Sequence, residues 1–100
     1  MAQKEVVWTS SAIRDRVEIF QYWAEHNKSD HFSRKLEQLF SEAARLIAVF
    51  PGAGAETDLM GVRVKVVRTY KLFYIVQDSA IVIIRVWDAR QDPEKFTTRR

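Results

Sequence analysis

The sequence has no cysteine, and histidine, glycine and proline are scarce. Without cysteine the chain can form neither a disulfide bond nor a thiolate metal site. The two histidines, His26 and His31, are five positions apart, which is not the i, i+4 spacing of a helical ligand pair. The three glycines do not have the spacing of a phosphate-binding loop. We therefore expect neither a metal site nor a cofactor.

Long hydrophobic runs are also missing from the sequence. No apolar stretch approaches the roughly 20 residues that a membrane span requires. The opening residues (MAQKEVVWTSS) lack the apolar region of a signal peptide. We expect a cytoplasmic protein with no membrane partner.

The 100 residues, 47% of them apolar, are enough for one hydrophobic core, so we predict a single domain over residues 1–100. Charge is distributed unevenly along this domain. Residues 1–50 carry seven Lys/Arg and seven Asp/Glu, whereas residues 51–100 carry nine against six, which gives the whole net charge of +3. Between Met60 and Gln77 there are four cations and no acid. Such a local positive field attracts anions more strongly than the net charge suggests.

Two helices are predicted after a short opening strand. Residues 4–8 (KEVVW) favour a strand, and residues 9–11 (TSS) can cap a helix by accepting hydrogen bonds from its first N–H groups. Apolar residues at helical spacing then predict a buried stripe at Ile13, Val17, Phe20 and Ala24, widened by Ile19 and Trp23. A second helix is predicted from Ser29 or Asp30 to Pro51, with its apolar stripe at Phe32, Leu36, Leu39, Phe40, Ala43, Leu46, Ile47 and Phe50.

Residues 53–60 (AGAETDLM) show no periodicity and predict a loop, and β-strand alternation follows it. Three strands are predicted over residues 62–67, 70–75 and 82–87, and their short connections favour an antiparallel meander. The patterns together predict an α+β fold. In it, an N-terminal strand precedes a two-helix hairpin that packs on an antiparallel sheet of about four strands.

Alternation along the strands also assigns side chains to the faces of the sheet. We expect the valines at alternate positions of strand 62–67 to face the helices, and Arg63 and Lys65 to look away from them. Lys71, on the next strand, can then lie near the same face, so that a groove carrying several cations results. Arg85 lies in the most apolar strand and must reach solvent or an anion, because an unpaired buried guanidinium is very costly.

These cations allow two interpretations. A charged outer sheet face prevents edge-to-edge aggregation, whereas a cluster of cations can bind phosphates. The residues alone leave both open. Arg68 belongs to the same cluster, and Trp87, beside Asp88 and Arg90 at a strand end, is placed where it can stack on a base or on a partner side chain.

Three short motifs follow one another in the second half: LMGVRVK at residues 59–65, YKLFY at 70–74 and IRVWDARQDP at 84–93. In this order and at this spacing they resemble the second, third and fourth strands of the RelE/ParE toxins of type II toxin–antitoxin systems. The resemblance extends over nearly the whole chain. It implies the RelE/ParE fold and the toxin component of such a module, which inhibits growth.

The resemblance implies one of two targets. RelE-type members cut mRNA in the ribosomal A site with a Lys/Arg cluster and a late Tyr or His, whereas ParE-type members poison DNA gyrase and lack a nuclease site. By motif position, the catalytic cations would be Arg63, Lys65, Lys71 and Arg90. The late tyrosine is replaced by Phe96, which can stack on a base but cannot transfer a proton, so enzymatic activity stays an open question. The residues expected to contribute to binding are Arg68, Arg85, Trp87, Asp88 and Phe96.

A cognate antitoxin is implied by the same resemblance. Antitoxins of this superfamily fold a disordered tail over the toxin, and an acidic, amphipathic segment would suit a basic sheet face. Three functions remain open: a gyrase inhibitor, a ribosome-dependent endoribonuclease, and an inactive module that only pairs with its antitoxin and regulates their promoter. The Tyr22-Trp23 pair and the residues from Trp87 to Pro93 look more like the ParE side.

Overall fold

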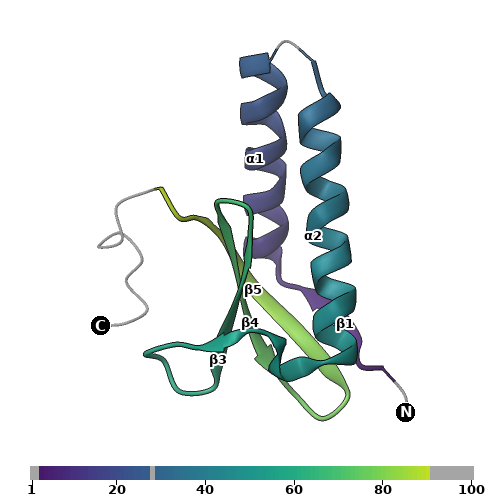
Figure 1. Cartoon of the computed structure of the whole chain (residues 1–100), viewed down its shortest axis with the longest axis vertical. Coiled ribbons are helices and arrows are strands. Elements are labelled where there is room, and N and C mark those ends of the chain that lie inside the picture. The colour runs from purple at the N-terminus through teal and green to yellow at the C-terminus, as the bar shows by residue number, and fades with distance from the viewer. Residues whose placement is uncertain (1–2, 28, 91–100) are drawn as a thin grey trace.

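The computed structural model describes residues 3–27 and 29–90, as a sheet with a two-helix hairpin packed on it (Figure 1). The elements are β1 (Glu5–Trp8), α1 (Ser10–Asn27), α2 (His31–Val49), a short 3-10 helix η1 (Pro51–Ala53), β2 (Ala55–Glu56), β3 (Val62–Val67), β4 (Tyr70–Val76) and β5 (Ala80–Asp88). The predicted order of a strand, two helices and three strands is confirmed. In the part of the chain described here, neither helix is long and apolar enough to cross a membrane.

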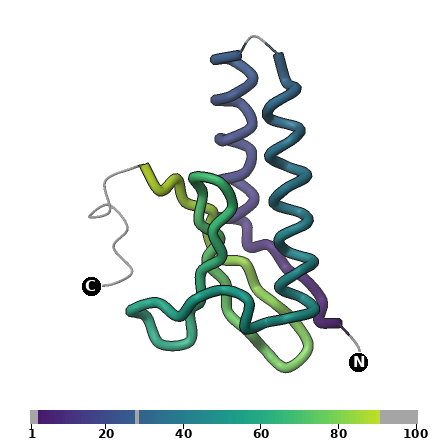
Figure 2. The backbone as a smooth tube through the Cα atoms, viewed as in Figure 1, coloured from purple at the N-terminus to yellow at the C-terminus, as the bar shows by residue number. Residues whose placement is uncertain are grey.

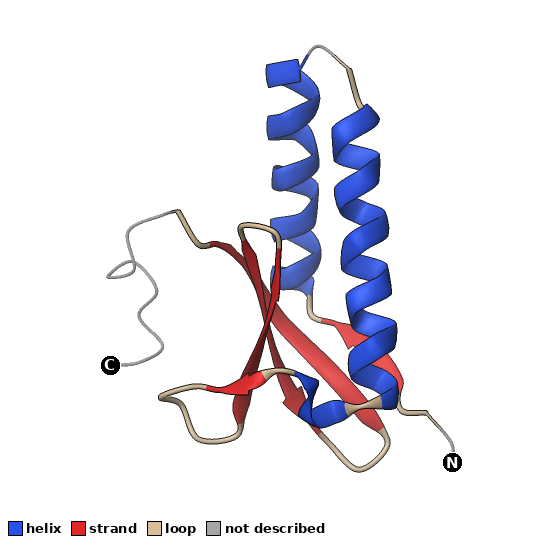
Figure 3. Cartoon of the chain, in the orientation of Figure 1, coloured by secondary structure: helices blue, strands red, loops and turns tan. Residues whose placement is uncertain are grey.

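The sheet has five strands in the order β1-β5-β4-β3-β2 (Figure 3). This is one more than the four expected, because β2 forms inside the segment predicted to be a loop. β1 pairs with β5 in parallel, from Glu5 opposite Ala80 to Trp8 opposite Ile83, and all other pairs are antiparallel. The start of the chain therefore lies beside its last strand, which the backbone tube makes visible (Figure 2).

Thr9 joins the start of α1 to β5. Its hydroxyl accepts a hydrogen bond from the Ala12 N–H (3.1 Å) and so caps the helix, as the sequence predicts. The same hydroxyl donates to the Ile84 carbonyl (3.0 Å), and the Thr9 N–H donates to the Ile83 carbonyl (3.0 Å). Since β1 pairs with β5 only as far as Ile83, α1 begins where β1 stops covering the edge of β5.

The core lies between α2 and the middle of the sheet. Leu36, Phe40 and Ile47 of α2 pack with Leu72 and Tyr74 of β4, and all five are at most 1% exposed. Burying a large apolar side chain of this kind contributes roughly 1.5–3 kcal/mol. Of the predicted α2 stripe, the middle is confirmed, whereas three positions are more than a third exposed: Phe32, Leu46 and Phe50.

The predicted stripe of α1 is only partly confirmed, because Ile19 and Trp23 pack against the core whereas the side through Ile13 and Val17 does not. Ile13 and Val17 are 50% and 49% exposed, whereas Ala12 and Asp15 are the buried residues of this helix. The small Ala12 side chain lets the helix approach the sheet closely. Asp15 faces the sheet because it accepts hydrogen bonds from β5. Helical periodicity detects apolar residues and gives no weight to a buried carboxylate of this kind.

The predicted faces of β3 were also wrong. Arg63 pairs with Tyr74 and Lys65 pairs with Leu72, and paired residues of an antiparallel sheet share a face. Because Leu72 and Tyr74 lie in the core under α2, the two cations belong to the helix side. Lys71 pairs with Val66 and therefore lies on the opposite face. β3 sits near the edge of the sheet, where its own alternation does not reveal which face the helices cover.

Candidate functional site

Arg85 and Asp15 form a bidentate ion pair between β5 and α1. Arg85 Nε lies 2.8 Å from Asp15 Oδ2, and its second nitrogen lies 3.0 Å from Oδ1. The Val86 N–H also donates to Asp15 Oδ2 (2.9 Å), at the stretch of β5 that β1 no longer covers. The hydrogen bonds that the Arg85 guanidinium donates to the Asp15 carboxylate raise the pKa of Arg85. Arg85 thus has its anion inside the protein, and Asp15 fastens α1 to the sheet.

Arg90 and Asp88 form a second ion pair at the end of β5. The Arg90 guanidinium approaches the carboxylate at 3.0 Å and 2.8 Å, and the Arg90 N–H donates to the same group at 2.9 Å. The Arg90 guanidinium holds the pKa of Asp88 below its usual range, and Asp88 raises the pKa of Arg90. Arg90 also lies over the Trp23 ring, 5.6 Å from its centroid. These two charges neutralise each other at the surface.

A cleft of about 440 Å³ lies between α1 and the end of β5, with both ion pairs in its walls. Glu18 and Tyr22 line it from the helix, and Trp87 lines it from the sheet. At its base, the Trp23 indole N–H donates to the Tyr70 hydroxyl (2.7 Å), and burial raises the pKa of that hydroxyl. Apart from Glu18, the charged residues in its walls are paired with each other, Asp15 with Arg85 and Asp88 with Arg90.

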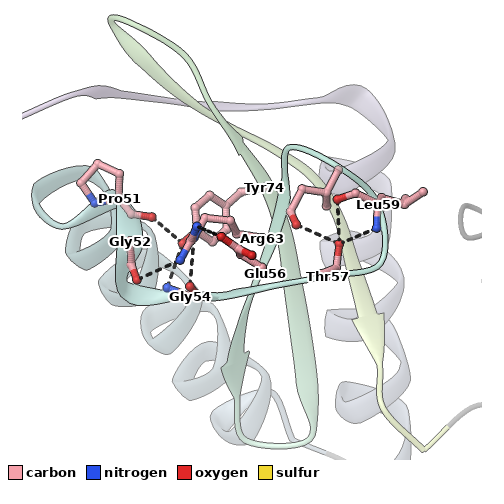
Figure 4. A network of polar contacts seen from close by, with 9 residues as sticks. Pro51, Gly52, Gly54, Glu56, Thr57, Leu59, Arg63 and Tyr74 are labelled. Carbon is pink, nitrogen blue, oxygen red and sulfur yellow. Dashed lines mark hydrogen bonds and ion pairs between the residues drawn. The ribbon is translucent and has the colours of Figure 1, made fainter.

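Arg63 holds the segment that follows α2 (Figure 4). Its Nε donates to the Gly54 carbonyl (3.0 Å), and its terminal nitrogens reach the Gly52 carbonyl (3.4 Å) and the Glu56 carboxylate (3.6 Å). The Tyr74 hydroxyl donates to the Pro51 carbonyl (2.7 Å) and accepts from the Gly54 N–H (2.9 Å). The Arg63 guanidinium is therefore occupied by the protein's own oxygens.

Gly54 is required by the same network. A Cβ atom there would come within 2.6 Å of the Val64 carbonyl oxygen and 2.7 Å of the Tyr74 hydroxyl. Such contacts are far shorter than van der Waals distance. A residue other than glycine would push the chain away from Tyr74 and from Arg63.

Lys65, Arg68 and Lys71 surround the end of the β3–β4 hairpin, and we call them the hairpin cations. Lys65 lies on the helix side, Lys71 lies on the open side, and Arg68 occupies the two-residue turn. Within residues 3–27 and 29–90, none of the three has an ion pair with a carboxylate. Arg68 has a left-handed backbone conformation (φ 58°), which costs energy for any residue except glycine.

The single basic pocket predicted from the sequence is not formed. Arg63 and Lys65 lie on one face, Lys71 lies on the other, and Arg90 is bound to Asp88 at the end of β5. Phe96 lies outside the described residues. The sequence interpretation missed Asp15 and Tyr74. The available signal for Asp15 was its position three residues after Ala12, one turn further along the same face of the helix.

The comparisons with known proteins agree with this architecture. The model of a family described as the ParE toxin of the type II toxin-antitoxin system parDE matches residues 6–93. Among solved structures, the chain resembles one from the chromosomal ParDE system of P. aeruginosa, with a TM-score of 0.76 and 20% identity over 88% of this chain and 98% of the other. A weaker likeness is to the E. coli DinJ-YafQ toxin-antitoxin complex (TM-score 0.49, 18% identity, 87% and 93% covered). No curated protein matches the sequence.

Proposed function

The chain belongs to the ParE toxin family and is the toxin of a type II toxin–antitoxin module, and we propose that it acts by binding and inhibiting DNA gyrase, without cleaving RNA. The proposal rests on one observation, which is that the four cations expected to form a nuclease site are not directed at a common point. RNA cleavage by the 2′-hydroxyl needs a base, an acid and several cations directed at one phosphate. Of the four residues expected to supply these cations, Arg63 and Arg90 are bound to oxygens of the chain itself.

The other two expected cations do not converge. Lys65 and Lys71 lie on opposite faces of the sheet, so the two ammonium groups cannot bind the same phosphate group. Asp88 is a poor general base, because Arg90 lowers the pKa of its carboxyl. Tyr70 is a poor general acid, because burial raises its pKa. Binding to a protein target requires none of these groups to transfer a proton.

A supercoiling assay tests the target. The purified chain, added to DNA gyrase with relaxed plasmid and ATP, is expected to inhibit supercoiling in proportion to its concentration. In the same preparation, primer extension on ribosome-bound mRNA is expected to show intact transcripts. Codon-linked cuts that disappear in Arg90→Ala, together with normal supercoiling, would overturn the proposal in favour of an endoribonuclease. An effect in neither assay would overturn it in favour of an inactive partner of the antitoxin.

The cognate antitoxin is the partner of a toxin in a type II module, and we propose that its toxin-binding segment is acidic and partly disordered. The hairpin cations support this, because they are the cations near β3 and β4 that the described carboxylates leave uncompensated. A segment that folds on binding can follow an irregular surface of this kind.

The proposed gyrase target places the toxin's action in the cytoplasm.

A further inference from the structure

The cleft between α1 and the end of β5 holds one charge that the protein does not pair. Its walls carry three carboxylates and two guanidiniums. The two internal ion pairs account for both guanidiniums and for Asp15 and Asp88, which leaves Glu18. Among residues 3–27 and 29–90, Glu18 is not part of an ion pair. The cleft therefore has one net negative charge.

Glu18 and Tyr22 lie next to each other along the helix wall of this cleft. Glu18 is exposed on α1. After the hydrogen bonds to Asp15, the charge of Glu18 contributes to the raised pKa of Arg85, so its carboxylate lies toward the cleft. Tyr22 follows one turn later on the same side of the helix and is 45% exposed. Its ring is held in place by stacking on His26, with 3.8 Å between the ring centroids.

The aromatic rings around the cleft already contact guanidinium groups of this chain. The Arg85 guanidinium carbon lies 5.5 Å from the centroid of the Trp87 ring, and that of Arg90 lies 5.6 Å from the Trp23 ring. A guanidinium suits such rings because it is planar and weakly hydrated, and because the face of a ring carries partial negative charge. Tyr22 adds a further ring beside an unpaired carboxylate.

We propose that this cleft receives the guanidinium of an arginine side chain that the inhibited protein presents, with Glu18 as its counterion and Tyr22 as a stacking surface. The proposal rests on the proposed function, in which the toxin acts by contact with a protein. A guanidinium can donate two N–H groups to the carboxylate while its planar face covers a ring. The net charge disfavours a phosphate group in the same place. The volume of about 440 Å³ lies within the usual range of ligand-binding clefts.

Titration of the isolated toxin tests the cleft without gyrase. The probe is N-acetyl-arginine amide at millimolar concentration, added to the full-length, isotope-labelled chain. N-acetyl-citrulline amide has nearly the same shape without the charge and is the control ligand. We expect the arginine probe to shift the indole N–H signals of Trp87 and Trp23, and the citrulline probe to leave them unchanged.

A substitution at Glu18 tests the role of its charge. Glu18→Gln keeps the size of an exposed side chain and removes the charge, so it should weaken arginine binding about two- to fivefold. Glu42→Gln removes an exposed carboxylate of α2 outside the cleft and is the matched control, expected to bind as the unmodified chain does. In the supercoiling assay, Glu18→Gln should raise the toxin concentration that half-inhibits gyrase by the same factor, and Glu42→Gln should not change it.

Several results would overturn the proposal. One is an absence of indole shifts at the highest arginine concentration, and another is an equal response to citrulline. Inorganic phosphate shifting the same signals would assign the cleft to anions. An unchanged half-inhibitory concentration for Glu18→Gln would show that the target does not use the cleft. An unmodified chain that does not inhibit gyrase at all would instead refute the proposed function, and the titration would still decide whether the cleft binds a guanidinium.

Discussion

The two cationic regions of this toxin differ in what balances their charge. At the end of β5, Arg85 and Arg90 are each bound by a carboxylate of the same chain. At the end of the β3–β4 hairpin, the hairpin cations have no such partner among residues 3–27 and 29–90. The planar guanidinium fits a carboxylate in two places and so builds structure, while the half-buried Lys65 and Lys71 have no carboxylate partner among the described residues. Equal charges in the sequence therefore have unequal roles in the fold.

The largest expected loss of stability is that of Asp15→Ala, which tests whether the bound cations are structural. The substitution leaves both the Arg85 guanidinium and the Val86 N–H without their acceptor, and we expect the free energy of unfolding to fall by about 3 kcal/mol. Chemical denaturation measures this change. Glu25→Ala, at an exposed position further along α1, is the control and should change stability by less than about 0.5 kcal/mol. Similar losses in the two variants would show that the Asp15 pair is not structural.

A smaller effect is expected when Arg63 and Lys65 are compared. The two residues lie on the same face of β3, but only the Arg63 side chain hydrogen-bonds the segment after α2. Arg63→Ala should lower stability by about 1–2 kcal/mol, and Lys65→Ala should leave it within about 0.5 kcal/mol. Lys65→Ala should instead weaken antitoxin binding, measured by calorimetry at low salt. If Lys65→Ala were the more destabilising variant, the assignment of a structural role to Arg63 and not to Lys65 would be wrong.

The smallest expected change in the free energy of unfolding is an increase. Arg68→Gly removes a side chain from a left-handed turn position and should raise the free energy of unfolding by up to about 1 kcal/mol. The same change removes one of the hairpin cations and should weaken antitoxin binding a few-fold. Thermal unfolding and calorimetry on one preparation measure both. A variant that is less stable, or that binds more tightly, would contradict the role given to Arg68.

Much of the fold follows from local patterns in the sequence. The strand, helix, helix and three-strand order was predicted because the α2 stripe and the β-alternation repeat over many residues. Thr9 was within the predicted cap for the same local reason. The two-residue strand β2 was not predicted, since its formation depends on Arg63 and Tyr74 holding the chain before it.

The site was predicted less well because it depends on which faces meet. Periodicity in β3 fixed two alternating sets of side chains and could not tell which set α2 would cover. The orientation of α1 depends on Asp15 meeting Val86, 71 residues away in the sequence. No local pattern contains such a partner. The roles proposed for Lys65, Arg68 and Lys71 likewise depend on which of the described carboxylates lie near them in three dimensions, and the charge count over residues 60–77 does not contain that information.

The parallel pairing of β1 with β5 also bears on how the toxin is made. β1 is synthesised early, but its partner strand is complete only when synthesis has passed Asp88. A contact between such distant segments closes a long loop and forms late, so the sheet cannot close before β5 has been synthesised. Closure of this sheet is therefore expected to be slower than formation of the two helices, whose contacts are local.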